Sequence, residues 1–288
     1  MFGHRPDGKR LKSISPYNKI IPHIMKARHD AQNIHKVQVD CKYLDEFVKK
    51  MREETGVVYS YMDILFSATV RMFALRPYIN RFVVNGRIYK RHNIQLAFVI
   101  KRGLTDESVD TTVKLTFDGT ESIEEVKKMI EDIVRENKVA TQKNGADTLM
   151  KIFTSGPNTI VKAGIGLLKW ADKHGLIPGS VLKSSPFHSS AFVTNLKSIK
   201  CDYVYHHLYD FGTTSLFLAM GKESMQPVVS TTGEIVPAKI MNIGVNMDER
   251  TTDGLYWANS LRLFQSFMRN PYVLTKKLDP SEVKKDVD

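Results

Sequence analysis

The sequence is poor in cysteine, and only Cys41 and Cys201 are present among its 288 residues. They lie far apart and lack the CxxC spacing of a zinc site, so the sequence supports neither a disulfide framework nor a metal site. No apolar run approaches the roughly eighteen residues that a membrane-spanning helix needs, and no apolar segment follows the charged N-terminus. We therefore expect a cytoplasmic protein with no metal and no transmembrane segment.

Acidic residues are scarcer than basic ones, 31 against 42, which gives a formal net charge of +11. This excess favours an anionic partner: nucleic acid, a membrane surface or a phosphorylated cofactor such as coenzyme A. The sequence has no zinc finger, recognition helix or basic stripe interleaved with aromatic residues, so nucleic acid has the least support. Residues 1–16 are predicted to form a basic, solvated arm, and residues 276–288 a charged, frayed tail.

Between these ends, residues 17–275 contain enough apolar residues for one domain with a substantial core. Alternating apolar and polar residues predict strands, whereas apolar stripes at helical spacing, led by Ser60 with Asp63 and Ser122 with Glu125 as caps, predict helices. Asn85-Gly86 predicts a tight hairpin turn. Together the elements indicate a mixed α/β structure. The predicted strands are 36–40, 82–84, 87–89, 95–100, 111–117, 191–196, 214–220 and 237–247, and the predicted helices are 42–54, 60–75, 122–134 and 257–268.

The strand at 237–247 has two different faces. Methionine and β-branched residues occupy one face, and Asn242, Gly244 and Asn246 occupy the other. A glycine between two polar residues indicates the close approach of another backbone or of a ligand.

Residues 141–186 read as two short helices separated by Gly156-Pro157. Apolar residues mark the first helix at Ala146, Leu149, Met150 and Phe153, and the second at Val161, Ile165 and Leu168; Gly175, Pro178 and Gly179 are expected to end the pair. The apolar content leaves two alternatives open, because these helices either pack on their own subunit or bind a protein partner.

Several blocks carry a family resemblance. These are Tyr17–Met25, Val39-Asp40-Cys41, Asn80–Tyr89, Phe192-Val193-Thr194-Asn195-Leu196, Ser224–Val228 and Asp248-Glu249-Arg250-Thr251-Thr252-Asp253-Gly254. In content and order they resemble the catalytic domain of the 2-oxo acid dehydrogenase acyltransferases (dihydrolipoamide acyltransferases), in the chloramphenicol acetyltransferase superfamily. The resemblance implies an α/β (two-layer α+β) fold, a mixed sheet covered by helices. It also implies a homotrimer that can assemble further, and coenzyme A or acyl-CoA as partner.

The resemblance also implies site residues. In that family a histidine removes a thiol proton, and a hydroxyl from the facing subunit stabilises the oxyanion. By motif position, Glu249 stands at the base and Thr194 supplies the hydroxyl. Asp253 and Arg250 fall on the loop-fixing carboxylate and its arginine partner. The resemblance places the cofactor-binding residues along the acyl channel at Asn195, His206 and His207.

Three departures bear on activity: no lipoyl domain is expected in this chain, residues 141–186 form an insertion, and Glu249 replaces the histidine. An ordinary carboxyl has a pKa of about 4.3 and a thiol about 8.5, so proton transfer costs roughly 6 kcal/mol, against about 3 for an imidazole. Burial would raise the carboxyl pKa and so narrow the difference from the thiol pKa, whereas Arg250 and the positive end of the following helix would lower the carboxyl pKa and widen that difference. Two functions stay open: an acyltransferase with Glu249 as acid or base, or a non-enzymatic acyl-CoA-binding, assembly or regulatory module.

Overall fold

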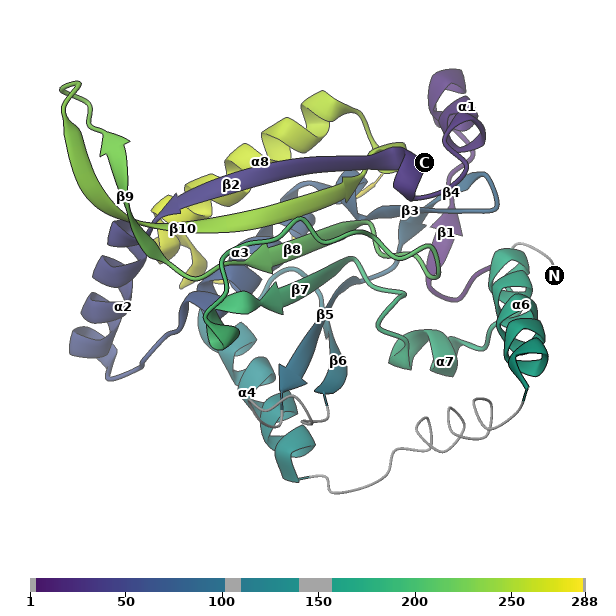
Figure 1. Cartoon of the computed structure of the whole chain (residues 1–288), viewed down its shortest axis with the longest axis horizontal. Coiled ribbons are helices and arrows are strands. Elements are labelled where there is room, and N and C mark those ends of the chain that lie inside the picture. Colours follow the sequence, from purple (N-terminus) through teal and green to yellow (C-terminus); the bar gives the residue numbers. More distant parts are fainter. Residues whose placement is uncertain (1–3, 102–109, 140–156, 287–288) are drawn as a thin grey trace.

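A seven-stranded mixed sheet forms the centre of the computed structural model, which describes residues 4–101, 110–139 and 157–286 (Figure 1). The strands are β2 (Gln32–Asp40), β5 (Ile94–Lys101), β6 (Asp110–Phe117), β7 (Ala191–Asn195), β8 (Leu216–Met220), β9 (Ser224–Val229) and β10 (Ile235–Asp248). Their order is β2-β10-β8-β7-β5-β6, with β9 paired to the first part of β10. Pairing is parallel between β5, β7 and β8 and antiparallel elsewhere. The predicted mixed α/β architecture is confirmed.

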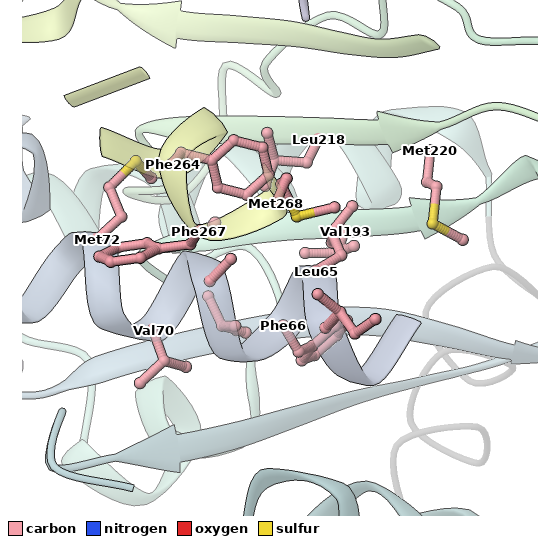
Figure 2. Close-up of a cluster of buried hydrophobic side chains, with 14 of the residues drawn as sticks. Leu65, Phe66, Val70, Met72, Val193, Leu218, Met220, Phe264, Phe267 and Met268 are labelled. Atoms are coloured by element: carbon pink, nitrogen blue, oxygen red, sulfur yellow. The ribbon is translucent and has the colours of Figure 1, made fainter. Parts of the chain in front are cut away.

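Four long helices cover one face of this sheet. They are α2 (Cys41–Thr55), α3 (Tyr61–Leu75), α4 (Ile123–Val139) and α8 (Gly254–Arg269). Helix α3 lies between α4 and α8, and its residues pack with β7, β8 and α8 in the main core (Figure 2). The predicted caps are confirmed: Ser60 and Asp63 form a reciprocal capping box, and Ser122 and Glu125 exchange equivalent hydrogen bonds.

A second, three-stranded sheet has the order β1-β4-β3 and comprises β1 (Gly8–Arg10), β3 (Arg81–Val84) and β4 (Arg87–Arg91). The predicted turn between β3 and β4 is confirmed, because Asn85 and Gly86 have φ values of 51° and 68°. Short helical segments complete the fold: α1 (Pro16–Ile24), η1 (His29–Ala31), η2 (Pro77–Asn80), η3 (Leu196–Ile199), η4 (Glu249–Thr251) and η5 (Pro271–Leu274).

Both terminal segments are packed on the domain, so their prediction as a solvated arm and a frayed tail was wrong for the described residues. Arg5 and Leu11 are buried, and β1 pairs with β4. Near the other end, Leu278 is buried, and Asp286 accepts two hydrogen bonds of 2.7 Å from Arg81. The many charged residues of these segments predicted exposure to solvent, but several of the charges pair with buried residues on distant segments.

The helical segment near residues 141–186 is described from residue 157. The predicted second helix is confirmed as α6 (Asn158–His174), and it ends as predicted at Gly175, its left-handed C-cap. A further short helix that was not predicted, α7 (Gly179–Ser184), begins at Gly179. The predicted first helix, marked by Ala146 to Phe153, lies outside the described residues. Figure 1 shows α6 beside β1 and apart from the helical layer. Among the described helices, none is long and apolar enough to cross a membrane.

Candidate active site

The polar face of β10 is covered by the chain that follows β7. A Cβ added to Gly244 would lie 2.0 Å from the carbonyl oxygen of Val204, so only glycine fits beneath this segment. The Asn246 amide fixes the cover, because its Nδ2 donates to the carbonyl oxygen of His206 at 2.9 Å. Of the two alternatives for the Asn-Gly-Asn face, the structure therefore shows close approach of a backbone.

Thr194 lies near the end of β7 on this same covered face. Successive side chains of a strand point to opposite faces of the sheet. Ala191 and Val193 point into the main core, so Thr194 lies on the opposite face with Phe192, toward the covering segment. Thr194 is half-buried. The next residue, Asn195, accepts a hydrogen bond from the backbone N–H of Ser198 at 3.3 Å and so caps η3.

His206 and His207 belong to the covering segment. The His206 ring stacks on Phe217, with 4.0 Å between ring centroids, and Phe217 stacks on Phe192 at 5.1 Å. His207 is exposed and stacks on His206 at 4.8 Å. Burial lowers the pKa of His206, and its contact with the His207 carbonyl opposes this shift. Two of the predicted site segments, the Thr194 strand and the His206 segment, thus meet on one face.

The loop after β10 is held by a buried ion pair. Asp248 accepts hydrogen bonds from Nε and Nη2 of Arg250 at 2.8 and 2.7 Å, and also from its backbone N–H at 3.1 Å. The expectation that Asp253 fixes this arginine was wrong. Asp253 is exposed and instead caps α8 by accepting the Tyr256 N–H at 2.8 Å.

Glu249 follows Asp248 and begins η4. Its side chain is exposed and forms no hydrogen bond or ion pair with the described part of the chain. The backbone N–H of Arg250 in this loop donates its hydrogen bond to Asp248 instead. Glu249 therefore does not fix its own loop.

One subunit does not bring Thr194 and Glu249 together. Across β8, Thr194 lies level with Gly244, and Glu249 lies five residues farther along the chain. With about 3.3 Å per residue and about 4.8 Å between strands, the two Cα atoms are roughly 19 Å apart. A site that uses both residues requires a second copy of the chain.

A cationic cavity near Arg250 was not found from the sequence. It has a volume of about 550 Å³, and α1, the β3–β4 turn, α6 and residues 210–212 enclose it. Its charged lining residues are Lys26, Arg28, Lys169, Lys173 and Arg250, with Asp172 and Asp210. These residues come from four segments that are far apart in the sequence, so no local motif predicts the cavity.

Arg28 is one of the buried charged residues that line this cavity, together with Asp172 and Arg250. Its guanidinium donates to the backbone carbonyls of Thr214 and Gly212, and burial lowers its pKa to about 10. Carbonyl oxygens satisfy its N–H groups without neutralising its charge. The cavity therefore keeps a positive character at neutral pH.

A buried charge cluster below the cavity was also missed. Arg5 donates to Asp172 at 2.8 Å and to both carboxylate oxygens of Asp7 at 2.8 and 2.9 Å. His188 Nε2 lies 3.3 Å from Asp172, outside hydrogen-bond geometry, and its Nδ1 contacts Ser185 Oγ at 2.8 Å. Within the described ranges, no group of histidine, cysteine and carboxylate side chains has the arrangement of a metal site.

Comparisons with known proteins agree with this architecture. The family model described as 2-oxoacid dehydrogenases acyltransferase (catalytic domain) matches residues 189–275. No curated protein matches the sequence. A probable dihydrolipoamide acetyltransferase from Listeria monocytogenes is similar in structure, with 13% identity, a TM-score of 0.56 and coverage of 90% of this chain and 94% of that chain.

Two further solved structures share the fold. The cubic core of the pyruvate dehydrogenase multienzyme complex has 11% identity and a TM-score of 0.58, covering 92% of this chain and 94% of that one. A chloramphenicol acetyltransferase has 11% identity and a TM-score of 0.53, covering 91% of this chain and 99% of that one. The chain therefore has the chloramphenicol acetyltransferase-like fold, and its residues 189–275 match the catalytic domain of the 2-oxoacid dehydrogenase acyltransferases.

Proposed function

We propose that this protein is a homotrimeric acyltransferase that transfers an acyl group from coenzyme A to an acceptor at sites shared between subunits. The observation that carries the proposal is the position of Glu249, which is exposed, unpartnered within the described chain and roughly 19 Å from Thr194 of the same subunit. A neighbouring subunit that presents its Thr194 to Glu249 would complete the site.

In this proposal Glu249 accepts the proton of the acceptor nucleophile as that nucleophile bonds to the thioester carbonyl carbon. Thr194 of the neighbouring subunit donates a hydrogen bond to the resulting oxyanion. When the carbon–sulfur bond breaks, Glu249 returns its proton to the leaving thiolate. The Asp248–Arg250 ion pair holds the backbone of the loop that carries Glu249.

Exposed lysines at the ends of β7 and β8 support an acyl-CoA ligand beside the Thr194 strand. Lys200 and Lys222 are exposed beyond the ends of β7 and β8, and the Lys222 N–H bonds to the carbonyl of Cys201 at 2.9 Å, which keeps the two turns together. Their charges suit coenzyme A phosphates.

Asn195, His206 and His207 are proposed to line the acyl path, because they flank the Thr194 face. Residues 17–275 would form the acyltransferase domain, and the segment at about 141–186 an insertion into it. The name of one structural relative describes a cubic core, so the trimers of this protein are also candidates for further assembly.

The first experiment is acyl-CoA thioester turnover by the purified full chain. We expect Glu249→Gln to lower kcat by about 100-fold or more and Thr194→Val to lower it by about 100- to 1,000-fold. Asp210→Asn, an exposed carboxylate in the cationic cavity, is the matched control and is expected to retain activity.

Mixing the two inactive variants tests the shared site. Trimers reassembled from Glu249→Gln and Thr194→Val chains would contain intact sites at about a quarter of their interfaces, because each site takes one residue from each neighbour. Recovery of about a quarter of wild-type activity supports the proposal. No recovery in trimers that are shown to be mixed contradicts it.

The replaced histidine favours a second function, an acyl-CoA-binding or assembly module without turnover. It predicts that calorimetry detects acyl-CoA binding while thioester turnover stays at the uncatalysed rate. It also predicts that Glu249→Gln leaves binding unchanged. Turnover that appears only in Glu249→His would identify the chain as a binding module that has lost its base.

A further inference from the structure

Helix α6 exposes an apolar face to solvent. Of its 17 residues only Asp172 is buried. Ile160, Leu167 and Trp170 lie on one face at positions i, i+7 and i+10, and are 55, 66 and 48% exposed. The fold therefore leaves three large apolar side chains of one helix face in contact with water.

Charged contacts, rather than this apolar face, attach α6 to the domain. Arg5 donates to both the side chain and the backbone carbonyl of Asp172, at 2.8 and 2.7 Å, and His188 lies against the other carboxylate oxygen. Asp172 is 12 residues beyond Ile160, so the attachment is near the C-terminal end of α6. The apolar face is not needed for this attachment and is available to another surface.

A stripe of lysines runs along another face of the same helix. Lys162, Lys169 and Lys173 occupy positions i, i+7 and i+11, and none forms an ion pair with the described residues. Lys169 and Lys173 also line the cationic cavity, where Lys26 and Arg28 add further positive charge. A helix with an exposed apolar face beside unpaired lysines suits a partner whose surface has an anionic outer layer and an apolar layer beneath it.

Helix α1 adds a second apolar stripe at the rim of the same cavity. Tyr17, Ile20 and Ile24 are exposed at positions i, i+3 and i+7, while Pro22 and His23 line the cavity. Figure 1 shows α1 and α6 at the same end of the molecule, away from α2 and the β9–β10 hairpin.

We propose that this end of the protein binds the surface of an anionic phospholipid bilayer through α6. Helices that lie in a membrane interface combine Leu, Ile and Trp on one face with Lys on the polar face, as α6 does. Leu167 and Trp170 enter the boundary between headgroups and acyl chains, and the lysines and the cavity contact lipid phosphates. This inference does not depend on acyl transfer.

Vesicle co-sedimentation of the full chain tests the proposal. We expect binding to vesicles of phosphatidylcholine with phosphatidylglycerol, weakened by salt, and at least tenfold weaker binding to phosphatidylcholine alone. The double variant L167E/W170E should lose at least tenfold in affinity. V58E/V273E replaces two exposed apolar residues elsewhere and should bind as the wild type does.

Tryptophan fluorescence gives an independent measurement. The sequence has two tryptophans, and Trp257 is buried, so a blue shift on adding anionic vesicles should come from Trp170 and disappear in W170F. Lysine substitution in K162A/K169A/K173A should remove the preference for anionic vesicles.

Three results would overturn the proposal. Wild-type protein that binds neither vesicle, or both equally, excludes an anionic lipid surface. L167E/W170E that binds anionic vesicles as tightly as the wild type excludes α6 as the contact. L167E/W170E that changes the oligomeric state in sedimentation velocity assigns the face to another copy of the chain.

Discussion

Helices α3 and α6 are similar in length and both carry apolar residues at helical spacing, yet their surroundings are opposite. In α3, 13 of 15 residues are buried, whereas in α6 only Asp172 of 17 residues is buried. Helix α3 lies between two other helices and the sheet, and α6 lies beyond the edge of that layer (Figure 1). The spacing of apolar residues along a helix thus shows that the helix has a face suited to burial, but it does not show which surface covers that face.

The two helices also differ in what holds them in place. Apolar contacts of α3 with β5, β7, β8 and α8 form the centre of the core, and Phe66 meets Phe98 edge-on at 5.2 Å between ring centroids. Helix α6 is held by Asp172, which pairs with Arg5. The difference predicts that truncating apolar side chains damages α3 and that altering one carboxylate damages α6.

The largest effect is expected in α3. Phe66→Ala removes a fully buried ring and should lower the free energy of unfolding by about 3–5 kcal/mol, because the core loses apolar burial and keeps a cavity. Urea denaturation measures this change. A loss below about 1 kcal/mol would show that the core around α3 is far looser than the structure indicates.

A smaller effect is expected at the attachment of α6. Asp172→Asn keeps the shape of the side chain but removes the charge that Arg5 and His188 face, and should cost about 1.5–3 kcal/mol. Amide hydrogen exchange should quicken in α6 more than in α3. Asp210→Asn changes an exposed carboxylate and should alter neither; equal loss of protection in both helices would contradict a separate attachment.

Acidification should weaken the same attachment. Burial lowers the pKa of His188, although Asp172 opposes the shift, and Arg5, Asp7, Ser185 and Phe211 are its other close neighbours. The folded state then binds fewer protons than the unfolded state between this lowered pKa and about 6.5, so stability rises with pH through that window and is lost on acidification.

Unfolding measured between pH 7.5 and 5 checks this sign. In His188→Asn the pH-dependent part should shrink, whatever the change in absolute stability. His35→Asn, at an exposed histidine of β2, should keep the wild-type slope. A wild-type protein that gains stability as the pH falls from 7 to 5 would show that Asp172 dominates and that His188 is charged in the fold.

Local signals predicted the elements well, because each depends on residues close in sequence. The Ser60–Asp63 box, the Asn85-Gly86 turn and the glycine of the Asn242–Asn246 face all had the predicted consequence. Pairings between distant segments were not predictable in this way. Arg5 pairs with Asp172 and Arg81 pairs with Asp286, and only the folded chain brings these charges together.

The candidate site was likewise predictable from the sequence only in part. Sequence placed Thr194 and Glu249 at positions of known chemistry in the resembling family, and only the sheet register showed that one subunit keeps them apart. The cationic cavity had no sequence signal, since Lys26, Arg28, Lys169 and Arg250 are joined only by the fold.

The smallest effect is expected on the exposed face of α6. Leu167→Ser changes a side chain that is 66% exposed, so the free energy of unfolding should change by less than about 0.5 kcal/mol in the absence of lipid. This small change in the free energy of unfolding can be compared with that of Phe66→Ala only if α6 remains folded. Far-ultraviolet circular dichroism of the variant checks that it does. A loss of more than about 1 kcal/mol would mean that Leu167 packs against protein in solution. Helix α6 would then be a second α3, buried by a partner copy rather than left available for another surface.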